Sequence, residues 1–124
     1  MVVVVDASAV AAIAFGEPDG PTLTAHLSGQ SLIAPTLFDY ELANIAWKKS
    51  RRHPVLAPAI QAALEASAYL PINRVAVPAG EMLRLARATG LTAYDASYLW
   101  LARSRDAELV TLDSRLAKAA GQAR

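Results

Sequence analysis

A chain of 124 residues can bury one hydrophobic core but is short for two, so we expect a single domain over residues 1–124. Hydrophobic residues make up 54% of the sequence, charged residues only 19%, and the formal net charge of +1 is no evidence for a nucleic-acid partner. The lack of cysteine excludes disulfides, thiolate zinc sites and cysteine nucleophiles. The apolar start has no basic residue before it, and no segment approaches the ~20 apolar residues of a membrane span, so we expect a cytoplasmic protein with no membrane partner.

The first half of the chain alternates predicted strands and helices. Four valines at residues 2–5 favour a central strand that is buried on both faces. Pro54 should end the longest helix, because proline removes a backbone donor and restricts the residue before it. The predicted elements are strands over residues 2–5 and 31–34, and helices over residues 7–15, about 20–28 and about 37–53.

The second half continues the same alternation. Pro78 favours the start of a helix and Gly90 its end. The predicted elements are helices over residues 58–70, 78–89, 93–105 and 114–120, with strands over residues 72–77 and 108–112. Strands that alternate with helices in this way predict an α/β fold around a mainly parallel sheet.

Four acidic residues occupy positions where a carboxylate is useful to a metal ion. Asp6 and Asp113 follow the first and last predicted strands, whereas Glu41 and Asp95 lie on predicted helices with mainly apolar neighbours. Ligands of open α/β sheets collect outside the carboxyl ends of the strands, so acids from distant segments can meet there. Carboxylates that share a pocket repel one another unless a cation neutralises them, and hard oxygen ligands favour Mg²⁺ or Mn²⁺. The sequence therefore predicts a divalent-metal site.

Taken singly, the three aspartates have a simpler explanation. Asp6 and Asp113 each precede a predicted helix and could cap it, and Thr92 with Asp95 has the spacing of a capping box. Glu41 has apolar residues four positions before and after it, so no local ion pair accounts for it. The conjunction of all four acids at strand ends and on helices that face them favours the metal site.

Further polar residues surround these acids. Ser8 and Thr111 lie two residues from Asp6 and Asp113, and could support the acids through hydrogen bonds, as could Asn44 beside Glu41. Basic residues between positions 48 and 52 could bind phosphates, although cations also favour helix C-termini: Lys48, Lys49, Arg51 and Arg52.

The helix predicted over residues 37–53 is apolar on two sides. Phe38, Leu42 and Ile45 form one apolar arc, and Tyr40 and Trp47 belong to another. The core of the domain can cover only one of them. We therefore expect another protein chain to cover the second.

Several segments that contain these acids also match a known family. The chain resembles the PIN-domain ribonucleases, in particular the VapC toxins of bacterial toxin–antitoxin pairs. The matching segments are Val-Val-Asp6-Ala-Ser8-Ala, Gly16-Glu17-Pro18, Glu41-Leu-Ala-Asn44, Leu91-Thr-Ala-Tyr-Asp95-Ala-Ser-Tyr-Leu-Trp-Leu-Ala102 and Leu109-Val-Thr111-Leu-Asp113.

The resemblance implies a PIN-like three-layer α/β/α sandwich and a metal-dependent endoribonuclease that cleaves an RNA substrate. It also implies homodimerisation, and inhibition by a cognate VapB-type antitoxin whose tail occupies the active-site groove. By position, Asp6, Glu41, Asp95 and Asp113 would form the acidic site that uses Mg²⁺ or Mn²⁺. Family members usually continue into a short final strand, and we expect that edge strand to be absent or shortened here.

The alternatives are a different Mg²⁺-dependent phosphohydrolase and a catalytically silent PIN-like binding module. A haloacid-dehalogenase-type phosphatase would need a second Asp two residues after the first, where this chain has Ser8, and a phosphate-accepting receiver domain would need paired acids after the first strand. A catalytically silent PIN-like binding module would need none of the acids, yet all four are present.

Overall fold

The computed structural model describes residues 1–121, and its elements follow the predicted alternation. The strands are β1 (Val2–Val5), β2 (Ser31–Pro35), β3 (Ile72–Val75) and β4 (Glu108–Val110). The helices are α1 (Ala7–Ala14), α2 (Gly20–Leu27), α3 (Phe38–Arg52), the 3₁₀ turn η1 (Pro54–Leu56), α4 (Ala57–Ser67), α5 (Ala79–Thr89), α6 (Ala93–Ser104) and α7 (Ser114–Ala119).

The four strands form one parallel sheet in the order β3-β2-β1-β4. Val4 of β1 lies opposite Ile33 on one side and Leu109 on the other, which makes β1 a central strand. Val3, Val4 and Val5 are all buried, as a strand covered on both faces requires. The carboxyl ends of β1 and β4 therefore meet at the same edge of the sheet.

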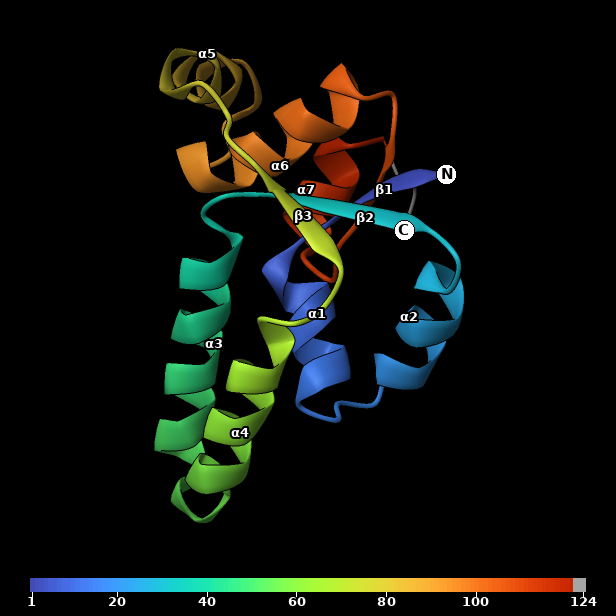
Figure 1. The fold of residues 1–124 in the computed structure, drawn as a ribbon. Helices are drawn as coiled ribbons and strands as arrows, with labels where there is room; N and C mark the ends of the chain where they lie inside the picture. The colour runs from blue at the N-terminus through green and yellow to red at the C-terminus, as the bar shows by residue number, and fades with distance from the viewer. Residues whose placement is uncertain (122–124) are drawn as a thin grey trace.

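Helices cover both faces of this sheet and complete a three-layer α/β/α sandwich (Figure 1). Val3 and Val5 point into a core shared with α1 and α3, which includes Phe38 and Leu42. Val4 points the opposite way, into a core that includes Tyr98 and Leu99 of α6. The alternation of side chains along β1 thus builds two cores. The fold class predicted from the sequence is confirmed.

The connection after β4 differs from the prediction. The sequence predicted a strand as far as residue 112, but β4 ends at Val110. The backbone N–H groups of Leu112 and Asp113 donate to the hydroxyls of Ser8 and Thr111 instead of to a neighbouring strand. Side-chain acceptors therefore replace the sheet ladder and turn the chain toward α7.

Two expectations concern the rest of the chain. The prediction that a C-terminal edge strand is absent or shortened concerns residues 122–124, which lie outside the described residues. Within residues 1–121, no helix is both long enough and apolar enough to cross a membrane.

Candidate metal centre at the carboxyl edge of the sheet

Asp6 is the most firmly held of the four acids. It follows β1 directly, and its backbone N–H donates to the carbonyl of Val110 on β4. Its carboxylate accepts hydrogen bonds from the hydroxyls of Ser8, at 2.6 Å, and Thr111, and from the backbone N–H of Ala9 at 3.1 Å. The bond to Ala9 caps α1, so the predicted cap and the predicted site residue are the same side chain. Only 6% of Asp6 is exposed.

Glu41 is held by a contact with α6. It lies in the first turn of α3, and its Oε1 accepts a 2.6 Å hydrogen bond from the hydroxyl of Tyr98 on α6. Sequence reasoning did not single out Tyr98, although it lies in the segment around Asp95 that carries the family resemblance. A tyrosine among apolar residues of a helix is expected to pack in the core, and the sequence does not indicate which group its hydroxyl will bind.

Asp95 and Asp113 lie in more open positions at the starts of helices. Thr92, and not Asp95, caps α6, because its hydroxyl accepts from the backbone N–H of Asp95 at 3.1 Å. Asp113 is exposed and caps α7 by accepting from the backbone N–H of Leu116 at 2.9 Å. Capping accounts for one oxygen of Asp113 and leaves the other available.

The fold brings all four acids to one cavity of about 330 Å³, with Asn44 and Lys48 of α3 on the same wall. Its lining is Asp6, Ala7, Ser8, Glu41, Asn44, Ile45, Lys48, Asp95 and Asp113. The available donors are carboxylate, amide and hydroxyl oxygens, which suit a hard divalent cation, and the described residues of the lining include no sulfur or imidazole. Within residues 1–121, however, no three acidic, histidine or cysteine side chains are already grouped around one metal position.

Burial and mutual repulsion disfavour the ionised forms of three of the acids in the cavity. Burial raises the pKa of Asp6, and the charge of Asp113 adds to that, while hydrogen bonds from Ser8, Thr111 and Ala9 lower it. Burial likewise raises the pKa of Glu41, opposed by the Tyr98 bond and reinforced by the charges of Asp95 and Asp6.

Asp95 follows the same pattern. Burial is the largest cause of its raised pKa, and the charges of Asp113 and Asp6 raise it further, whereas Arg115 and the Thr92 hydroxyl lower it. A bound cation would relieve the repulsion that these acids share.

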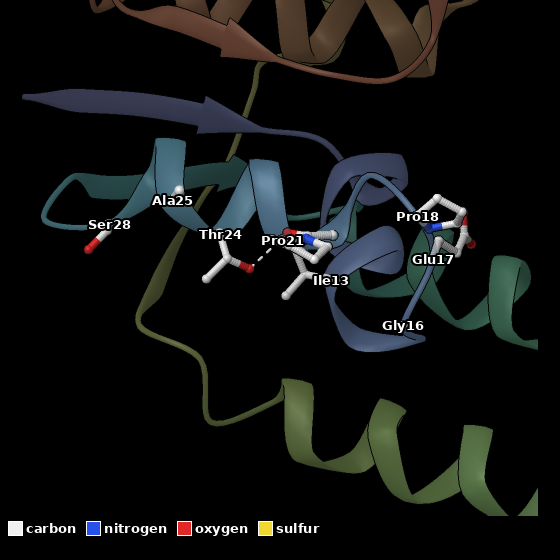
Figure 2. Close-up of a pocket in the computed structure, with 9 residues that line it drawn as sticks. Ile13, Gly16, Glu17, Pro18, Pro21, Thr24, Ala25 and Ser28 are labelled. Atoms are coloured by element: carbon white, nitrogen blue, oxygen red, sulfur yellow. Dashed lines mark hydrogen bonds between the residues drawn. The ribbon is translucent and has the colours of Figure 1, made fainter.

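A larger hollow lies elsewhere and lacks this chemistry. It has a volume of about 770 Å³ and is lined by residues of α1, of α2 and of the turn that connects them (Figure 2). Its lining is mostly apolar or backbone, with the Thr24 hydroxyl donating to the carbonyl of Gly20. Glu17, the acidic residue of this lining, pairs with Lys49 at 3.3 Å. The hollow therefore does not resemble the group of carboxylates at the sheet edge.

Comparison with known proteins agrees with this architecture. Residues 3–122 match the model of the PIN domain. The chain belongs to the PIN-domain family. It is 33% identical to Ribonuclease VapC3 of Pyrobaculum aerophilum over 123 residues, which cover 95% of this chain and 94% of that protein. The crystal structure of PAE2754 from Pyrobaculum aerophilum superposes with a TM-score of 0.77 at 31% identity, covering 100% of this chain and 91% of that one. Within the PIN family, the chain is therefore of the VapC type.

The raised pKa of Asp95 makes a prediction for stability without metal. A carboxyl group whose folded pKa exceeds its unfolded value, near 3.8, stabilises the fold at low pH and loses that contribution as the pH rises through the folded pKa. The amide that replaces this carboxyl group in the Asp95→Asn variant cannot titrate. In the presence of EDTA, the melting temperature of Asp95→Asn should therefore rise relative to that of the wild type as the pH rises from the unfolded pKa of 3.8 through the higher folded pKa.

Thermal melts followed by circular dichroism would measure this difference, with Asp19→Asn as the control for loss of an exposed carboxylate. A wild type that gains stability over Asp95→Asn as the pH rises would contradict the repulsion argued here.

Proposed function

We propose that this protein is a metal-dependent endoribonuclease of the PIN family that hydrolyses RNA phosphodiester bonds, and that it is the toxin of a toxin–antitoxin pair acting in the cytoplasm. The observation that supports the proposal most strongly is the convergence of Asp6, Glu41, Asp95 and Asp113 on one cavity from four separate segments. The 33% identity to Ribonuclease VapC3 supports the choice of RNA as substrate.

The donor set suits Mg²⁺ or Mn²⁺, and the four acids differ in how they would hold it. Asp6 is fixed by three hydrogen bonds and offers a rigid ligand. Asp95 is partly exposed in the first turn of α6 and can rotate toward the same ion, so these two are the proposed direct ligands. Asp113 would bind a second, weaker ion or act through water. Rotation of the Asp95 and Asp113 side chains on metal binding would bring their carboxylates close enough to Asp6 to complete the ligand set, which the described residues do not form on their own.

When bound, a divalent cation polarises the scissile phosphate and lowers the pKa of an attacking water. The protein's own residues supply the positioning. Ser8 and Thr111 hold the Asp6 carboxylate in one orientation. Glu41 faces the cavity from α3, where it can accept a proton from the water or orient it. No covalent intermediate is required.

Lys48 is the one cation among the described residues that line the cavity, and it is the proposed contact for an RNA phosphate. It lies two turns after Glu41 on α3, on the wall that carries Asn44. A lysine at the rim of an acidic cavity can hold a phosphate next to the scissile one without neutralising the acids. A single-stranded or looped RNA could lay its backbone into such a site.

Two protein partners follow from the proposed toxin role. The first is a VapB-type antitoxin whose tail would occupy the groove over the acidic cavity and exclude RNA. The second is another copy of this chain. Tyr40 and Trp47 lie on the outer face of α3 and are 79% and 59% exposed, with Arg51 stacked over the Trp47 ring at 5.5 Å. Exposed aromatic side chains of this kind are enriched in protein interfaces.

Removing the fixed ligand should abolish activity without unfolding the protein. Asp6→Asn keeps an oxygen for Ala9 and Ser8 but removes the charge, so Mn²⁺-dependent cleavage of single-stranded RNA should fall by more than roughly 100-fold, the upper loss seen for residues that only support a metal. Mn²⁺ should raise the melting temperature of the wild type in a concentration-dependent manner and that of Asp6→Asn much less. Undiminished cleavage by purified Asp6→Asn would reject the nuclease site. Mn²⁺ binding without any cleavage would instead indicate a silent module.

Replacing Lys48 should weaken RNA binding more than catalysis. For Lys48→Ala, the KM for RNA should rise several-fold while kcat changes little, because the phosphate contact is made in both ground and transition states. The slope of log(kcat/KM) against log salt should become shallower by about 0.7 for one lost phosphate contact on a single strand. Arg103→Ala, at the opposite end of α6 from Asp95, is the control and should keep the wild-type slope. An unchanged slope for Lys48→Ala would remove Lys48 from the RNA site.

The outer face of α3 should determine the oligomeric state. Tyr40→Ala with Trp47→Ala should convert a dimer to a monomer, because the two rings supply the apolar contact area. Sedimentation equilibrium would measure the association, with Tyr69→Ala as a matched control for an exposed tyrosine beyond α4. A wild type that stays monomeric, or a double variant that stays dimeric, would contradict the proposed interface.

A further inference from the structure

Tyr98 is a core residue whose hydroxyl reaches the wall of the acidic cavity. Its side chain is 1% exposed and packs in the core between the sheet and α6, with Val4 and Leu99. The phenol oxygen lies 2.6 Å from Oε1 of Glu41, to which it donates. The backbone N–H of Ala7, next to Asp6, interacts with the same oxygen. One hydroxyl on α6 thus donates to Glu41 of α3 and lies close to the junction of β1 with α1.

These three segments carry three of the four acids. Asp6 precedes Ala7, Glu41 is the acceptor itself, and Asp95 lies one turn before Tyr98 on α6. The hydroxyl is therefore placed where it can fix the relative positions of Asp6, Glu41 and Asp95, which a shift of α3 against α6 would change.

The orientation of the Glu41 carboxylate depends on this single hydrogen bond, whereas that of Asp6 is shared among three. Asp6 accepts from two hydroxyls and one backbone N–H, whereas the Tyr98 bond is the one hydrogen bond to the Glu41 carboxylate within residues 1–121. Glutamate has one more rotatable bond than aspartate and loses more rotamer freedom when it is ordered. Burial raises the pKa of Tyr98 well above its usual range, with the bond to Glu41 as the next cause, so the phenol stays protonated and remains a donor.

We propose that Tyr98 is a positioning residue for Glu41: its hydroxyl occupies Oε1 and leaves Oε2, which accepts no hydrogen bond within residues 1–121, for the cation or the attacking water. This inference rests on the proposed nuclease function and adds to it a residue outside the acidic group. A tyrosine that served packing alone would need only its ring, and phenylalanine would replace it without effect on the site. The hydroxyl is what the proposal makes necessary.

The test compares Tyr98→Phe, which keeps the ring, with Tyr69→Phe, which removes the hydroxyl of an 89% exposed tyrosine beyond α4. Mn²⁺ affinity, measured by electron paramagnetic resonance, should fall roughly 10- to 100-fold in Tyr98→Phe, the range for loss of a group that supports a ligand. The kcat for RNA cleavage at saturating Mn²⁺ should also fall by roughly 10-fold or more, with the KM for RNA unchanged. Tyr69→Phe should match the wild type in all three quantities. Wild-type Mn²⁺ affinity and kcat in folded Tyr98→Phe would overturn the proposal, as would a change confined to KM.

A measurement on the wild type covers the case in which Tyr98→Phe does not fold. The Tyr98 hydroxyl proton should exchange slowly enough to appear in the NMR spectrum, with a nuclear Overhauser effect to the γ-protons of Glu41. Absence of that signal would overturn the proposal.

These readouts also separate the proposal from the proposed function. If the wild type cleaves no RNA, the nuclease assignment fails, and the NMR signal together with the Mn²⁺ affinity of Tyr98→Phe still decides the role of Tyr98. If the wild type cleaves RNA and Tyr98→Phe is unaffected, only the positioning role fails.

Discussion

The structure depends on the hydrogen bonds that hold the buried carboxylate of Asp6 at the end of the central strand. Ser8 and Thr111 come from segments that are more than 100 residues apart, and both donate to Asp6. The same two hydroxyls accept hydrogen bonds from the backbone N–H groups of Leu112 and Asp113, and β4 therefore ends at Val110. One small network therefore fixes a charged side chain, terminates a strand and delivers Asp113 to the cavity. Buried polar groups with this degree of satisfaction rigidify a fold and specify one arrangement.

The opposite wall of the cavity is built by a second, simpler contact. Tyr98 connects Glu41 of α3 to α6 through one hydrogen bond, and α6 also carries Asp95. The four acids differ in how firmly they are held. Asp6 and Glu41 accept hydrogen bonds from side chains of other segments, whereas Asp95 and Asp113 lie at helix starts near solvent. A site with two fixed and two adjustable acids can close around a cation without moving the backbone. In the proposed metal site, a bound cation would relieve the repulsion among the acids.

Much of this arrangement could be predicted from the sequence because it depends on residues that are close together in the chain. Four valines followed by Asp6 indicate a buried parallel strand with an acid at its carboxyl end, and Pro54 and Gly90 mark helix ends that the structure confirms within a few residues. The meeting of Asp6 with Asp113 followed from the topology of parallel sheets. The early end of β4 did not, because it depends in part on the Ser8 hydroxyl, which is 104 residues from Leu112 in the sequence. Tyr98 was missed for the same reason: nothing local distinguishes a core tyrosine with a polar partner across the fold from one without.

Anomalous diffraction from crystals soaked in Mn²⁺ would show whether the four acids hold one divalent-metal centre. We expect an anomalous peak in the cavity within about 2.0–2.6 Å of oxygens from Asp6 and Asp95, with Asp113 rotated toward it and the Tyr98 bond to Glu41 intact. Manganese bound only at other sites, or a cavity whose carboxylates point away from one another in saturating Mn²⁺, would contradict it.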